Sequence, residues 1–87
     1  MRNLLLVALL VASPLALAKT ECSTADKVQW QDKDNFQQDL KNQGYEIKKF
    51  KVTDGNCYEI YGKNKEGKKV EIYFDPVTGK KVKEEID

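Results

Sequence analysis

The residues whose types and spacing could support chemistry are two cysteines and two pairs of glutamate and tyrosine. Cys22 and Cys57 are the only cysteines, and they lie far apart rather than in a Cys-x-x-Cys pair. In an oxidising compartment they are expected to form one intramolecular disulfide, which stabilises by about 3–4 kcal/mol for a loop of this span. Free redox thiols and a metal site are the alternatives, and the wide spacing and the absence of histidine disfavour both.

Glu59 and Glu71 are the carboxylates that could act as an acid–base pair. Alternation in the surrounding sequence places them on the solvent-facing side of a sheet, where charge is expected, so we predict solvated structural carboxylates. Without histidine the usual general base is missing, and we find no nucleophile motif, phosphate loop or ligand cluster. The sequence therefore predicts a protein that is not an enzyme, with no catalytic residue, no cofactor and no metal site.

Tyr61 and Tyr73 are candidates for a partner-binding surface, together with Glu59 and Glu71. They occupy the same predicted sheet face, and tyrosine is favoured in protein interfaces because it combines apolar area with a hydroxyl group. Two alternatives remain open. The pairs can be ordinary cross-strand contacts, or residues 19–29, tethered by a disulfide, can cover this face. An edge strand offers another route, by pairing with an extended peptide.

Residues 1–18 have the pattern of a secretory signal peptide. Arg2 precedes an apolar run, and the small residues Ala16 and Ala18 suit signal peptidase, which predicts cleavage near Ala18-Lys19. The run is shorter than the ~20 residues that cross a bilayer. The residues before Cys22 do not form a lipobox.

The product is therefore expected in the periplasm or secreted, as one domain over residues 19–87 with no stable membrane anchoring after signal cleavage. Cleavage removes Arg2, the only arginine, so the fifteen basic residues become fourteen, against fourteen acidic ones. A domain with no net charge is a poor candidate for binding nucleic acid or an anionic membrane, and we expect neither.

One short helix is predicted over residues 33–43. Asp32 can cap its first turn, Phe36 and Leu40 lie four residues apart on one face, and Gly44 suits the left-handed position that ends a helix. Trp30 is expected to pack on the same side. The sequence then changes from helical to alternating periodicity.

Strands are predicted over 45–52, 57–62 and 70–74, with a weaker edge strand over 80–86. An out-of-phase pattern near Lys48-Lys49 predicts a β-bulge. The loop Asn64-Lys65-Glu66-Gly67 predicts a hairpin in which the facing pairs are Tyr58 and Phe74, Glu59 and Tyr73, Ile60 and Ile72, and Tyr61 and Glu71. The register of the last strand is not predicted. The fold class is α+β, with one N-terminal helix packed on a three- to four-stranded antiparallel meander.

This order of features resembles the PepSY domain, in its small stand-alone exported form. The most specific pieces are Gly44-Tyr45, Cys57-Tyr58-Glu59 and the turn from Asp75 to Gly79. PepSY domains occur in propeptides of secreted metalloproteases and as lone periplasmic proteins, so the resemblance implies a non-enzymatic module that binds an unknown protein or peptide, for which a protease is one candidate. The alternative is a trans-acting inhibitor or regulator of a secreted or periplasmic protease. A small-ligand or metal carrier is the weakest hypothesis, because the core is thin.

Overall fold

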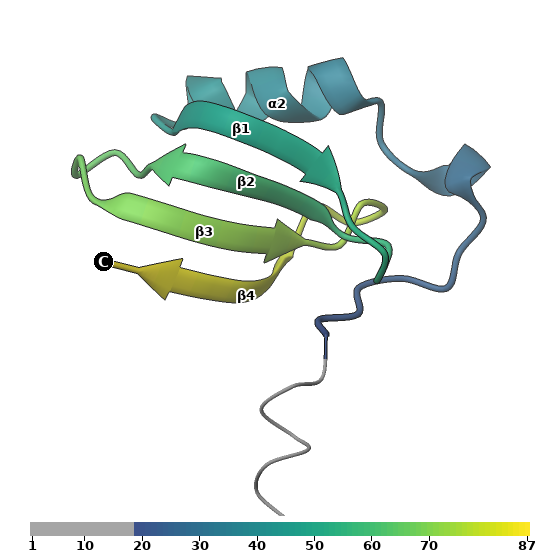
Figure 1. Cartoon of the computed structure of the whole chain (residues 1–87). Coiled ribbons are helices and arrows are strands. Elements are labelled where there is room, and N and C mark those ends of the chain that lie inside the picture. The colour runs from purple at the N-terminus through teal and green to yellow at the C-terminus, as the bar shows by residue number, and fades with distance from the viewer. Residues whose placement is uncertain (1–18) are drawn as a thin grey trace, which may run out of the picture.

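One helix packs on one face of a four-stranded antiparallel sheet in the computed structural model, which describes residues 19–87 (Figure 1). The predicted signal peptide lies outside the described residues. The elements are η1 (Lys27–Gln29), α2 (Lys33–Asn42), β1 (Glu46–Val52), β2 (Tyr58–Lys63), β3 (Lys69–Phe74) and β4 (Lys81–Ile86). The α+β prediction is confirmed, with the helix in the middle of the chain rather than at its N-terminus.

Helix α2 forms where the sequence predicted it. The Asp32 carboxylate accepts a hydrogen bond from the Asn35 amide at 3.0 Å, which satisfies a donor in the first turn. Gly44, at φ 104°, follows the helix end in a conformation that only glycine adopts cheaply. Phe36 and Leu40 are the two buried residues of the helix, so it attaches to the sheet through one narrow stripe.

The sheet is a meander with strand order β1-β2-β3-β4. The predicted bulge is confirmed, because the pairing of β1 with β2 shifts register between Ile47 and Lys49. The hairpin between β2 and β3 has the predicted register, in which Ile60 faces Ile72 and the Asn64 amide donates to the Lys68 carbonyl at 2.9 Å.

The core fills the space between α2 and the sheet. Its buried members are Phe36, Leu40, Tyr58, Ile60, Val70, Ile72 and Phe74, with Trp30, Tyr45, Ile47 and Phe50 packed around them. The Phe36 ring contacts three other aromatic rings, and Trp30 meets Tyr58 edge-on at 5.6 Å. The Tyr58 hydroxyl donates to the Gln31 carbonyl at 2.6 Å, which satisfies the polar end of a buried ring.

Strand β4 is the edge strand, and the structure supplies the register that the sequence left open. Ile86 faces Val70 and Glu84 faces Ile72, and the register shifts between Tyr73 and Phe74. Val82 and Ile86 are 46% and 51% exposed, so β4 adds little to the core. Within residues 19–87 no helix is long and apolar enough to cross a membrane.

The predicted disulfide between Cys22 and Cys57 is present and ties the N-terminal segment to the start of β2. Residues 19–29 lack regular structure apart from η1. The Cys22 amide donates to the Gly55 carbonyl at 3.0 Å. A Cβ at Gly55 would clash with the Thr20 carbonyl oxygen, so this close approach requires glycine.

Candidate functional site on the outer sheet face

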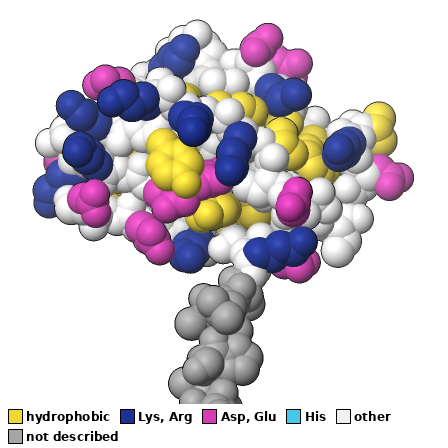
Figure 2. All heavy atoms as spheres, viewed as in Figure 1, with side chains coloured by type: hydrophobic (Ala, Val, Ile, Leu, Met, Phe, Trp, Pro, Cys, Tyr) yellow, Lys and Arg dark blue, Asp and Glu magenta, His cyan; other side chains and the backbone are white. Residues whose placement is uncertain are grey.

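The four predicted partner-binding residues lie together on the outer face, which we define as the side of the sheet opposite α2. Glu59 faces Tyr73 across β2 and β3, and Tyr61 faces Glu71 one step further along the same pair of strands. We call these four side chains the Tyr/Glu quartet. Figure 2 shows this side of the molecule, where apolar and acidic side chains meet at the centre and lysines surround them.

Glu59 is 1% exposed, so the prediction of a solvated carboxylate is wrong for this residue. Its strand is an inner one, and it lies between Lys51 on β1 and Tyr73 on β3. The Lys51 ammonium is 3.9 Å from Glu59 Oε1. The long side chains on both neighbouring strands therefore exclude water from Glu59. The alternating sequence of β2 alone had indicated that this residue would be exposed. Glu71, the other carboxylate, is half-buried.

The pKa values of Glu59 and Glu71 shift in opposite directions. Burial, followed by the interaction with the Glu71 carboxyl group, raises the pKa of Glu59, and the interaction with Glu59 lowers the pKa of Glu71. Glu59 Oε2 is buried and has no hydrogen-bond partner among residues 19–87. The surroundings of Glu59 therefore favour its uncharged form, whereas those of Glu71 favour its charged form.

Both tyrosines have raised pKa values beside the acidic pair. The Tyr73 hydroxyl donates to Glu71 Oε2 at 3.0 Å, and burial together with this bond raises the pKa of Tyr73 to about 12. Hydrogen bonding to Glu71 and Glu59 raises the pKa of Tyr61. Both phenols therefore stay neutral at physiological pH.

Lysines flank the quartet on both neighbouring strands. Lys49 Nζ lies 5.9 Å from the centroid of the Tyr61 ring, and Lys83 Nζ lies 5.8 Å from that of Tyr73. These are favourable cation–π distances. Tyr61 is 38% exposed and Tyr73 is half-buried, so aromatic surface remains accessible among the charges.

The N-terminal segment borders the outer face without covering Tyr61. Lys19 and Thr20 line a shallow hollow with Glu59 and Tyr73 at one end of the quartet. After Cys22, which forms the disulfide, the chain continues to η1 and α2 on the other side of the sheet (Figure 1). The hypothesis that residues 19–29 hide both tyrosines is therefore wrong for Tyr61.

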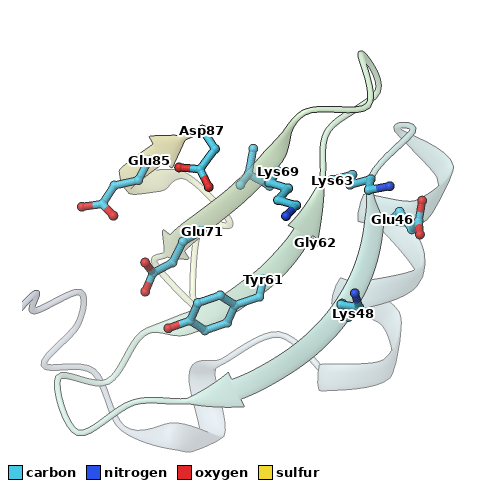
Figure 3. Close-up of a pocket in the computed structure, with 10 residues that line it drawn as sticks. Glu46, Lys48, Tyr61, Gly62, Lys63, Lys69, Glu71, Glu85 and Asp87 are labelled. Atoms are coloured by element: carbon cyan, nitrogen blue, oxygen red, sulfur yellow. The ribbon is translucent and has the colours of Figure 1, made fainter.

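A second hollow lies at the opposite end of the quartet (Figure 3). Tyr61 and Glu71 extend from neighbouring strands along one side of it, and Lys63 and Lys69 lie further along the same two strands. The hollow thus combines an aromatic ring with charges of both signs. Across residues 19–87, no three His, Cys, Asp or Glu side chains gather in a way that could hold a metal ion.

Sequence reasoning found the quartet but not its internal chemistry. The pairing of Tyr61 with Glu71 and of Glu59 with Tyr73 follows from the hairpin loop. The positions of Lys49 and Lys51 depend on the bulge in β1, whose location sequence analysis gave only approximately. The exact pairing of β1 with β2 would have placed Lys51 opposite Glu59. That neighbour would have indicated that this carboxyl group is enclosed.

Replacing Glu59 with glutamine is expected to remove a pH-dependent loss of stability. The ordinary carboxyl pKa here is 4.5, and the folded-state pKa of Glu59 is higher. Stability from the protonated group is therefore fully present below about pH 4.5 and is lost as the pH rises through the raised pKa. The introduced glutamine carries no charge at any pH, so it avoids the cost of a buried charge, and at pH 8 the E59Q variant should be more stable by about 1–2 kcal/mol.

Urea unfolding of wild type and E59Q from pH 4 to pH 9 measures this difference. The contribution of Glu71, whose pKa is lowered, is retained above its ordinary value in both proteins and is lost as the pH falls through the lowered pKa. Glu66→Gln, at an exposed hairpin position, is the matched control. A stability difference between E59Q and wild type that does not change with pH would contradict the raised pKa of Glu59.

The fold and the site together describe a small disulfide-linked module with one covered and one accessible sheet face. The family comparison agrees with this description, because the model of the peptidase propeptide and YPEB domain matches residues 3–85. The chain belongs to this PepSY family, which confirms the resemblance inferred from its motifs. No curated protein and no solved structure matches it.

Proposed function

We propose that this protein is a non-enzymatic module that binds a protein or peptide partner through the outer face, in the periplasm or outside the cell. One observation carries the proposal: two tyrosines lie at the centre of a sheet face that no element of residues 19–87 covers. Signal cleavage near Ala18-Lys19 would deliver the domain to that compartment. A disulfide and a PepSY domain both fit an oxidising extracytoplasmic environment.

The chemistry of the outer face suits recognition of another protein. Interfaces favour aromatic residues at the centre and charged residues at the rim, which is the arrangement of Tyr61 with its neighbouring lysines. The hydrogen bond from the Tyr73 hydroxyl to Glu71 holds the Tyr73 ring before a partner arrives. Preorganised side chains lose less entropy on binding, so each contact yields more affinity.

A capture experiment with a double variant tests this proposal. The purified exported protein is immobilised and exposed to envelope extract from the source cell, and the retained proteins are identified by mass spectrometry. Replacing Tyr61 and Tyr73 with alanine is expected to reduce retention of the partner at least about tenfold, as loss of central aromatic contacts does. Circular dichroism checks that the variant is folded.

Val28→Ala is the matched control for that experiment. Val28 is 88% exposed and lies in η1, away from the outer face, so its loss should not change retention. Undiminished retention by the tyrosine double variant would refute the assignment of the binding surface.

The family match favours a second candidate function, inhibition or regulation in trans of a secreted or periplasmic protease. This candidate requires that the captured partner be a protease and that its activity fall at a stoichiometric concentration of this protein. Titration of a panel of secreted metalloproteases measures that activity directly. If all proteases of the panel keep full activity and the captured partner is not a protease, the inhibitor hypothesis is rejected. The proposal of a general binding function would then remain.

A further inference from the structure

One row of residues on the outer face crosses all four strands and has a lysine at each end. Lys51 on β1 faces Glu59 on β2, Glu59 faces Tyr73 on β3, and Tyr73 faces Lys83 on β4. We call these four residues the lysine-ended row. All four line the shallow hollow beside the N-terminal segment, and Lys19 lines it with them. The hollow therefore collects positive charge from three separate parts of the chain.

Both lysines of the row incline toward its middle. Lys51 Nζ lies 3.9 Å from Glu59 Oε1, and Lys83 Nζ lies 5.8 Å from the centroid of the Tyr73 ring. Since Glu59 and Tyr73 face each other on the two inner strands, the ammonium groups approach the same region of the surface from opposite edges of the sheet. Both lysine side chains are accessible to solvent, so a ligand can reach both charges.

Acidic groups of the protein balance little of this positive charge. Lys83 Nζ lies 3.5 Å from Glu85 Oε2, but the two side chains are 48% and 60% exposed, and exposed ion pairs are weak in water. Burial raises the pKa of Glu59, which favours its uncharged form. Asp54, an exposed residue, is the other acidic group that lines the hollow. The hollow therefore keeps an excess of positive charge that attracts an anion.

Glu59 gives the hollow a polar group that lacks a partner. The residue is 1% exposed, and its Oε2 atom has no hydrogen-bond partner among residues 19–87. A buried polar group without a hydrogen bond is costly, so a ligand that supplies the missing partner gains binding energy. An uncharged carboxyl group donates a hydrogen bond, and a carboxylate accepts one. The hollow thus suits a carboxylate in both charge and hydrogen bonding.

The neighbouring row of the outer face has the opposite balance of charge. Lys49 faces Tyr61, Tyr61 faces Glu71, and Glu71 faces Glu85. The interaction with Glu59 lowers the pKa of Glu71, which favours its charged form. This row therefore sets one lysine against two carboxylates. An acidic ligand group is attracted to the lysine-ended row and repelled by the row beside it.

We infer that the lysine-ended row binds an acidic side chain, aspartate or glutamate, of the protein that contacts the outer face. The carboxylate lies between the ammonium groups of Lys51 and Lys83 and accepts a hydrogen bond from Glu59. This inference rests on the proposed function and adds the chemistry of the partner to it. The contrast between the two rows also fixes which way the partner is oriented, because complementary charges set the register of an interface.

A titration with blocked peptides, followed by the amide NMR signals of the exported protein at low ionic strength, tests the inference. The probes are eight residues long and alternate threonine with glutamate, glutamine or lysine. The glutamate peptide is expected to shift the amide signals of the lysine-ended row, and the other two are not. Lys51→Gln/Lys83→Gln should weaken its binding at least about fivefold, through the loss of two charge contacts.

Lys63→Gln/Lys69→Gln is the matched control. These lysines lie at the opposite end of the quartet, and their replacement changes the net charge of the protein by the same amount (Figure 3). Binding of the glutamate peptide to this variant should change no more than about twofold, since distant charges are partly screened. Lys51→Glu/Lys83→Glu should bind the lysine peptide in place of the glutamate peptide, a gain that a misfolded variant cannot produce.

Equal shifts with the glutamate and glutamine peptides would overturn the inference, as would equal weakening by the two glutamine double variants. A threonine peptide with a free C-terminal carboxylate that binds better than the glutamate peptide would assign the row to a chain terminus and reject a side chain. In the capture experiment, full retention by Lys51→Gln/Lys83→Gln with loss in the tyrosine double variant would reject this inference alone. Full retention by both would reject the proposed function as well.

Discussion

Removal of the Cys22–Cys57 disulfide is expected to lower the free energy of unfolding by about 3–4 kcal/mol. The link joins residues 35 positions apart, and cross-linking restricts the unfolded chain more strongly when the loop is long. A domain of this size has a thin core and a small margin of stability. The loss is therefore a large fraction of the total, and the reduced protein is expected to be partly unfolded under mild denaturing conditions.

The reduced state is also expected to release the N-terminal segment from the sheet. Besides the disulfide, this segment is held near β2 by the hydrogen bond from the Cys22 amide to the Gly55 carbonyl and by the Asn56 side chain, which donates to the Ser23 carbonyl at 3.2 Å. Urea unfolding with and without a reductant measures the effect. A Cys22→Ala/Cys57→Ala variant is the control and should match reduced wild type with no further response to reductant. Equal midpoints for oxidised and reduced wild type would contradict this account.

Phe36→Ala is expected to destabilise the protein by about 3–5 kcal/mol, in the range of large-to-small aromatic substitutions in cores. The Phe36 ring is buried and lies 5.0 Å from the ring of Tyr58 and 5.1 Å from that of Phe74, measured between centroids. Only Phe36 and Leu40 anchor α2, so this one truncation removes about half of the attachment of the helix to the sheet.

The matched control for this substitution is Lys41→Ala, on the exposed side of the same helix. It is expected to change the free energy of unfolding by no more than about 0.5 kcal/mol, as surface substitutions do. Denaturant unfolding followed by circular dichroism measures both variants. A loss below about 1 kcal/mol for Phe36→Ala would show that the helix is not the main cover of the core face.

The predictable part of the fold was encoded in local patterns. The spacing of Phe36 and Leu40 and the cap at Asp32 located the helix, because both signals act within a few residues. The hairpin loop that ends at Gly67 set the register of β2 and β3, and that register placed Tyr61, Tyr73, Glu59 and Glu71 on one face. The predicted register agrees with the structure because turn geometry and apolar alternation favour the same pairing of β2 with β3.

The unpredicted features depend on contacts between strands. The burial of Glu59 comes from Lys51 and Tyr73 on its two neighbours, and alternation along β2 alone carries no information about them. The register of β4 was open because nearly every position is charged, so no apolar pattern selects one alignment. In the structure Tyr73 faces Lys83 and Phe74 faces Lys81, so the register shifts by one residue between these two pairs.

The two faces of the sheet have different roles in this account. The helix covers one face and supplies stability through a compact aromatic core. The outer face keeps an aromatic surface accessible, since Tyr61 is 38% exposed. A buried carboxyl group whose pKa is raised avoids the penalty of two adjacent negative charges. The hydrogen bond from the Tyr73 hydroxyl to Glu71 fixes part of the quartet as a preformed contact surface.

Site-specific photo-crosslinking in the source cell tests the central claim, that partners bind at the outer face. A benzophenone side chain replaces Lys49, which faces Tyr61 on the outer face, or Lys41, which lies on the exposed side of α2. We expect a crosslinked partner when the probe is at position 49 and none when it is at position 41. A partner crosslinked only from position 41, or equally from both positions, would contradict it.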